Sequence, residues 1–178
     1  MKILKVKNIV YLYKKSFYKI YALLFGQVNL LRRLGGNVGN GCRFIGKNEF
    51  GSEPYLISIG NNVSMTSSYF VNHDGGVWVF RKEHPSIDIV KPIRIENNVF
   101  IGSHCIIMPG VTIGSNVVVG AGSVVTKSLE PNAVYAGIPA KRIKSLEEYK
   151  SSVLAMNLNT KGMSCKRTYL ESHFRLEK

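Results

Sequence analysis

The sequence predicts an all-β fold in which short strands wind into a stacked, three-sided coil. Two observations predict this fold. An aliphatic residue recurs at every sixth position, and a second residue that is aliphatic or small follows each of them four positions later. A period of six is neither the 3.6 of a helix nor the alternation of a long strand. The two sets are Ile95, Ile101, Ile107, Ile113, Val119 and Val125, and Val99, Cys105, Val111, Val117, Ser123 and Leu129.

Residues that tolerate a left-handed backbone stand in register with this period and mark the corners of the coil. Gly and Asn enter that conformation most readily, and His is also enriched there. Ile59 precedes Ile95 by 36 residues, a whole number of repeats, and Val38 begins a less regular first coil. We therefore expect coils over about 38–71 and 93–140. The corner residues are Asn98, His104, Gly110, Asn116, Gly122 and Ser128.

Residues 2–25 are predicted to form an amphipathic helix within an N-terminal extension, 1–37. Apolar residues from Ile3 to Leu24 recur at spacings of three and four, and most lysines lie off this stripe. Two interpretations stay open. The helix packs on the coil or on a neighbouring subunit, or it lies on the surface of an anionic membrane.

The coil domain is predicted to span 38–144 and to be followed by a C-terminal segment, 145–178. Ser145 and Glu148 form a capping-box pattern, which predicts a helix from there through Met156. A polar, basic tail follows Asn157.

The composition favours an anionic partner and a reducing compartment. Lys and Arg total 24 against 11 Asp and Glu, and residues 1–48 contain no acidic residue. Three cysteines, an odd number, argue against a disulfide framework. The uncharged run Ile20–Leu31 is too short to cross a bilayer. We expect a cytoplasmic protein, with peripheral contact to the inner membrane face through residues 2–25 as one option.

The period is interrupted between Val71 and Pro92, and an irregular loop on a rigid scaffold is a common place for function. Within this loop, 72–92, His73 is the best candidate for a general base, because imidazole accepts protons near neutral pH. His84 is the competing candidate, and a histidine without a role is the alternative. A backbone carbonyl, Glu83 or Asp88 could orient the ring; Asp74 points to the opposite side of an extended chain.

Six strings of this sequence form one ordered pattern over about 38–145. They are Ile59-Gly60-Asn61-Asn62-Val63, Asn72-His73-Asp74, Phe100-Ile101-Gly102-Ser103, Pro109-Gly110-Val111-Thr112-Ile113-Gly114, Val119-Gly120-Ala121-Gly122-Ser123-Val124-Val125-Thr126-Lys127 and Ala136-Gly137-Ile138-Pro139-Ala140-Lys141. This pattern closely resembles the hexapeptide-repeat acetyltransferases, and above all the O-acetyltransferases of capsule, lipopolysaccharide and exopolysaccharide synthesis.

The resemblance implies a left-handed parallel β-helix with an extruded active-site loop, assembled as a homotrimer with active sites between subunits. It implies acetyl-CoA as co-substrate and His73 as the catalytic residue. Gly102, Ser103, Gly120 and Ala121 would follow the pantetheine arm of the cofactor. Its nucleotide end would lie near Thr126, Lys127, Ala140 and Lys141, where cations suit phosphates.

The expected reaction is direct O-acetylation of a sugar hydroxyl in surface polysaccharide biosynthesis. Trp78 and Phe80 could stack on a sugar, and Asn72, Asp74 and Arg81 could bind its hydroxyls, as part of a glycan or a nucleotide-linked sugar. An N-acetyltransferase acting on a nucleotide-linked amino sugar is the nearest alternative.

Two other classes are less favoured. A γ-type carbonic anhydrase would need three imidazoles on one zinc ion, and the spacing of His73, His84 and His104 does not suit this, so no metal is expected. The second less favoured class is a non-catalytic β-helix that serves as a scaffold. The basic residues are not interleaved with aromatic residues along a groove, so no nucleic acid is expected either.

Overall fold

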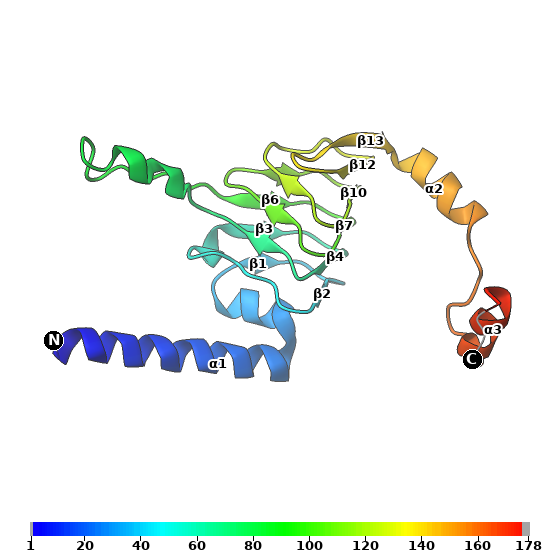
Figure 1. Ribbon diagram of the computed structural model, residues 1–178, viewed down its shortest axis with the longest axis horizontal. Coiled ribbons are helices and arrows are strands. Elements are labelled where there is room, and N and C mark those ends of the chain that lie inside the picture. Colours follow the sequence, from blue (N-terminus) through cyan, green and yellow to red (C-terminus); the bar gives the residue numbers. More distant parts are fainter. Residues whose placement is uncertain (1, 176–178) are drawn as a thin grey trace.

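The computed structural model describes the backbone of residues 2–175 and the side chains of residues 16–175. The chain forms a stack of coils with three sheets as its sides (Figure 1). The first sheet contains β1 (Asn37–Val38), β3 (Ile57–Ile59), β6 (Ile93–Ile95) and β9 (Thr112–Ile113). The second sheet contains β2 (Arg43–Ile45), β4 (Val63–Thr66), β7 (Val99–Ile101), β10 (Val117–Val119), β12 (Ala133–Ala136) and β13 (Lys141–Ser145). The third sheet contains β5 (Tyr69–Phe70), β8 (Ile106–Ile107) and β11 (Val124–Val125).

The register of the strands confirms the predicted period. Ile113 pairs with Ile95, and Val125 pairs with Ile107, at a spacing of 18 residues on two different sheets. These pairings are parallel, and β13 joins β12 in the antiparallel sense. Every residue of the two predicted inward-facing sets is buried, so the core is a continuous column inside the prism.

Five of the six predicted corners adopt the left-handed conformation, with φ from 55° at Asn98 to 80° at Gly110. Ser128 does not, and the prediction is wrong there. Its hydroxyl instead accepts a hydrogen bond from the Thr112 N–H at 3.0 Å. The last coil is also shorter, because Leu129 pairs with Ile113 at a spacing of 16 residues.

Helix α1 (Lys2–Arg33) is longer than predicted and changes direction at Gly26, where φ is 81°. After this kink, Leu30 and Leu31 are buried against the first coil. The part of the predicted stripe before residue 16 lies outside the described side chains. Among the described residues, no helix has both the length and the hydropathy required to cross a bilayer.

The C-terminal segment leaves the last coil and extends away from it (Figure 1). Ser145 and Glu148 form the predicted capping box at the start of α2 (Leu146–Ala155). The helix ends one residue earlier than predicted, and Met156 is its C-cap. The tail after Asn157 contains a further short helix, α3 (Lys166–His173), which was not predicted.

Candidate active site

The segment between β5 and β6 projects from the side of the coil (Figure 1), and two backbone hydrogen bonds hold its base together. The Asp74 N–H donates to the Ile89 carbonyl at 2.9 Å, and the Lys91 N–H donates to the Asn72 carbonyl at 2.8 Å. Between them, His73 pairs with Val90 in an antiparallel bridge. The backbone of His73 is therefore placed where the projecting segment leaves the coil.

The His73 ring is engaged on one side by residues of the preceding coil. Its Nδ1 lies 3.1 Å from the Ser52 Oγ and 3.3 Å from the Glu53 Oε2. The side chain of His73 is 45% exposed and that of Glu53 is 21% exposed. The ring is thus both anchored and accessible.

Sequence reasoning missed this pair of partners. It named a backbone carbonyl, Glu83 or Asp88, and none of these forms a hydrogen bond with the His73 ring in the described part of the chain. Ser52 and Glu53 precede His73 by 21 and 20 residues, about one coil. The six-residue period did not identify them, because the first coil is too irregular for its register to be assigned from the sequence.

The predicted acceptor residues are placed differently from one another. Asp74 accepts a hydrogen bond from the Gly76 N–H at 2.9 Å and caps the short 3₁₀ helix η2 (Gly75–Phe80). Trp78 is 73% exposed, with the Arg81 guanidinium 5.8 Å from its ring centroid. Asn72 is fully buried, and neither polar atom of its amide has a hydrogen-bond partner. Asp74, Trp78, Arg81 and the exposed Phe80 thus present polar or aromatic groups outside the coil, and Asn72 does not.

Gly102 and Gly120 lie at the same corner of successive coils, and their lack of a side chain allows close stacking. The Gly102 N–H donates to the Val119 carbonyl at 2.8 Å. A Cβ on Gly102 would lie 2.4 Å from the Ala121 nitrogen, and one on Gly120 would lie 2.9 Å from the Ala136 Cβ. The corner also includes Ser103, whose carbonyl accepts from the Gly122 N–H.

The other predicted cofactor residues lie across the third sheet or next to it. Because β5, β8 and β11 are parallel and in register, Thr126 and Lys127 follow β11 at the edge where His73 follows β5. The Ala140 N–H donates to the Val124 carbonyl at 2.8 Å, and Lys141 begins β13. The predicted cofactor residues therefore flank one face of the prism.

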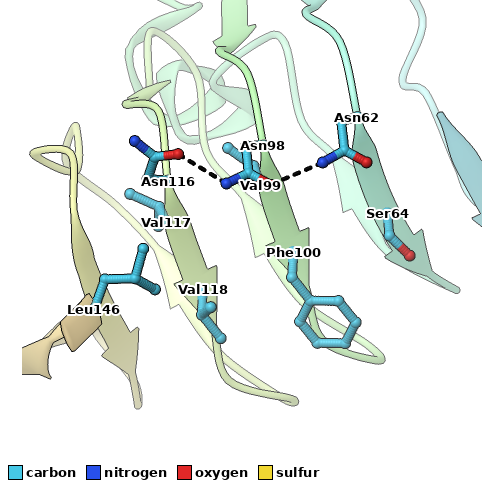
Figure 2. A pocket seen from close by; sticks show the side chains of 9 residues that line it. All are labelled: Asn62, Ser64, Asn98, Val99, Phe100, Asn116, Val117, Val118 and Leu146. Carbon is cyan, nitrogen blue, oxygen red and sulfur yellow. Dashed lines mark hydrogen bonds between the residues drawn. The ribbon is translucent and has the colours of Figure 1, made fainter. Parts of the chain in front are cut away.

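A surface hollow lies elsewhere, on the face formed by β4, β7 and β10 (Figure 2). Figure 2 shows Asn62, Asn98 and Asn116 joined along one edge of this hollow, and Phe100 farther along β7. None of the predicted catalytic, cofactor or acceptor residues lines it. Its polar edge is a row of corner side chains, and no His, Cys, Asp, Glu or Lys side chain lines it.

Nucleophilic attack by Cys105 and metal chemistry find no support in the described part of the chain. Burial raises the pKa of the Cys105 thiol, which disfavours the thiolate needed for nucleophilic attack. The described residues contain no group of three His, Cys, Asp or Glu side chains placed to hold a metal ion.

Comparisons with known proteins agree with this geometry. Residues 92–127 match a family described as the hexapeptide repeat of succinyl-transferase. Protein CapG of Staphylococcus aureus is 51% identical over 167 residues, covering 91% of this chain and 96% of CapG.

Two solved structures share both sequence and fold with the chain. A galactoside acetyltransferase in complex with coenzyme A is 30% identical, with a TM-score of 0.55, over 72% of this chain and 74% of that one. A maltose O-acetyltransferase from Clostridium difficile 630 is 29% identical, with a TM-score of 0.54, over 73% and 84%. The chain therefore belongs to the hexapeptide-repeat acetyltransferases, and its three-sided coil is the left-handed parallel β-helix of that family.

Proposed function

We propose that this protein transfers the acetyl group of acetyl-CoA to a sugar hydroxyl in surface polysaccharide biosynthesis. The observation that carries the proposal is the accessible, anchored imidazole of His73 at the base of a projecting loop. Similarity to acetyltransferases named for galactoside and maltose supports a sugar acceptor. The resemblance to polysaccharide O-acetyltransferases supports the polymer context.

In the proposed reaction, His73 acts as general base through Nε2, in a direct transfer. As the acceptor oxygen attacks the thioester carbonyl, Nε2 takes the hydroxyl proton and a backbone N–H stabilises the oxyanion. The C–S bond then breaks, and protonated His73 returns the proton to the CoA sulfur. The products are an acetyl ester and CoA, without a covalent acyl-enzyme.

Acetyl-CoA would cross the face formed by β5, β8 and β11. We propose that Gly102, Ser103, Gly120 and Ala121 follow the pantetheine arm at one edge of that face. The nucleotide end would lie at Thr126, Lys127, Ala140 and Lys141, whose two lysines suit its phosphates. In a homotrimer built from the 38–144 domains, this face would border a neighbouring subunit.

The loop 72–92 would cover the acceptor as an extruded active-site loop. Trp78 and Phe80 expose large aromatic faces suited to stacking on a sugar ring, and Arg81 and Asp74 offer polar groups beside them. Asn72, buried in the single chain, would contact the acceptor only after a rearrangement. A nucleotide-linked amino sugar is the second candidate, and a screen of hydroxyl and amine acceptors with labelled acetyl-CoA separates the two.

Replacing the base tests the proposed mechanism. We expect His73→Ala to lower kcat by about 10²–10⁴-fold, the usual contribution of general base catalysis. His84→Ala, in the same loop, should keep near wild-type turnover. The measurement is thiol release from acetyl-CoA in the presence of acceptor, with melting temperature as a check on folding. Near-normal turnover of His73→Ala would rule out the base assignment.

We also propose that α1 contacts the anionic inner face of the membrane, peripheral to a cytoplasmic enzyme. Within its described side chains, Ile20, Leu23 and Leu24 are exposed, and Leu23 is 85% exposed. The ten cations and no acids of residues 1–48 match an anionic surface. Vesicles containing phosphatidylglycerol should bind the protein, and Leu23→Gln with Leu24→Gln should weaken binding. Equal binding by both proteins, or binding only to neutral vesicles, would refute the contact.

A further inference from the structure

We infer that Glu53 and Ser52 are positioning residues for His73, and that the Glu53 carboxylate selects the ring tautomer that can act as a base. This inference rests on the proposed function, because it assigns a role to groups that touch the base and not the substrates. Neither residue follows from the repeat pattern, and neither belongs to the loop that carries His73.

The chemistry of the contact determines where the proton sits. An ionised carboxylate can only accept hydrogen bonds, so the contact between Glu53 Oε2 and His73 Nδ1 is favourable only when Nδ1 carries the proton. In the neutral ring, the lone pair is then on Nε2. Because no described residue hydrogen-bonds to Nε2, that atom is available to accept a proton from an acceptor hydroxyl.

The fold brings this pair to His73 through a close approach of two coils at Gly51. The Glu49–Tyr69 bridge sets the register of the coils. At Gly51, φ is 67°, and a Cβ would lie 2.6 Å from the Asn72 Oδ1 and 2.9 Å from the Phe70 carbonyl oxygen. Only glycine permits both this conformation and this spacing.

Glu53 is held from the other side as well. The Leu56 N–H donates to the Glu53 carbonyl at 2.9 Å, and Pro54 begins the short 3₁₀ helix η1 (Pro54–Leu56). Pro54 restricts the backbone just after the carboxylate. The imidazole is thus fixed between the base of its own loop and a rigid turn of the preceding coil.

The exposure of the pair separates a positioning role from a structural one. Both side chains reach solvent, and an ion pair or hydrogen bond in such a setting contributes little to stability. Loss of Glu53 should therefore change turnover much more than folding. If the carboxylate only stabilised the coil, its loss should change folding more than turnover.

The first experiment compares Glu53→Gln with wild type in steady-state kinetics. The glutamine amide is uncharged and can either donate to Nδ1 or accept from it, so it no longer selects the productive tautomer. We therefore expect kcat to fall about 10–100-fold, less than for a buried triad carboxylate. KM for acetyl-CoA and for the acceptor should stay within about twofold of wild type. Glu53→Asp should recover part of the loss, and Ser52→Ala should lower kcat about 2–5-fold. Glu147→Gln, on the surface of α2, is the matched control.

The second experiment reads the tautomer directly, by ¹⁵N NMR of the histidine-labelled protein at a pH where His73 is neutral. We expect the Nδ1–H form in wild type and a shift toward the Nε2–H form in Glu53→Gln. Wild-type protein in the Nε2–H form, or Glu53→Gln with unchanged kcat, overturns the inference.

The outcomes distinguish this inference from the proposed function. If His73→Ala is active, the base assignment itself fails. If His73→Ala is inactive and Glu53→Gln is fully active, only the positioning role fails. Should Glu53→Gln not fold, the wild-type NMR spectrum and Ser52→Ala still decide the question.

Discussion

The regular coils from β6 to β11 and the interrupted region around His73 use the same parallel ladders, but their corners differ. In the regular coils each corner is one residue in a left-handed conformation, such as Asn98 or Asn116. In the interrupted region, corners expand into a turn at residues 51–56 and a projecting loop at 72–92 (Figure 1). The candidate base His73 and its partners Ser52 and Glu53 all lie in the expanded corners. The repeat therefore builds a scaffold, and its interruptions offer the candidate chemistry.

The largest loss of stability is expected from substitutions in the buried core column of the regular coils. Ile107 is completely buried, so Ile107→Ala should lower the free energy of unfolding by about 2–5 kcal/mol through lost burial and a residual cavity. Val79→Ala, at an exposed loop position, should change it by less than about 0.5 kcal/mol. Chemical denaturation measures both. Equal losses would break the distinction between scaffold and loop.

A smaller loss is expected at the regular corners. The Asn98 side chain accepts from the Asn62 Nδ2 and donates to the Asn116 Oδ1, both at 2.8 Å. Asn98→Ala removes both bonds and leaves a left-handed backbone with a less suitable residue, at an expected cost of about 1–3 kcal/mol. Asn98→Gly restores the left-handed backbone preference without the hydrogen bonds. Its free energy of unfolding should therefore lie between those of the wild type and Asn98→Ala. If Asn98→Gly were as destabilised as Asn98→Ala, the conformational part of this explanation would be wrong.

The loop should show a change in binding with no change in folding. We expect Trp78→Ala to raise KM for the acceptor about tenfold, or roughly 1.4 kcal/mol, through the loss of an aromatic stacking surface. KM for acetyl-CoA and the melting temperature should be close to wild type. Initial rates at varied acceptor concentration measure the effect. An unchanged acceptor KM would remove Trp78 from the acceptor site.

The smallest expected effect is local and depends on pH. Hydrogen bonds from the Ser145 side chain and backbone hold the pKa of Glu148 below its ordinary value of 4.5. A carboxyl with a lowered folded-state pKa stabilises α2 above about pH 4.5, and that contribution is lost as the pH falls through the folded value. Amide NMR signals of residues 146–150 should report this loosening on acidification. Glu148→Gln should remove the response, and Glu147→Gln should retain it.

Part of the candidate site was within reach of sequence reasoning, and part was not. His73 stood out because it lies at the start of the one long interruption, whereas Gly102 and Gly120 were named through the family resemblance. Glu53 did not, because its contact with His73 depends on how an irregular first coil stacks. Asn72 was expected at the surface with its neighbours, and its burial reflects the side toward which the chain turns on leaving β5.

By itself, the sequence determined the period, the inward-facing column, the corners up to Gly122 and the capping box at Ser145. These are properties of short segments, in which alternation and left-handed propensity act on neighbouring residues. The tertiary structure alone decided the shortened last coil, the burial of α1 beyond Gly26 and the pairing of Glu53 with His73. Each depends on contacts between residues far apart in the chain, where the close packing of backbone and side chains outweighs local preference.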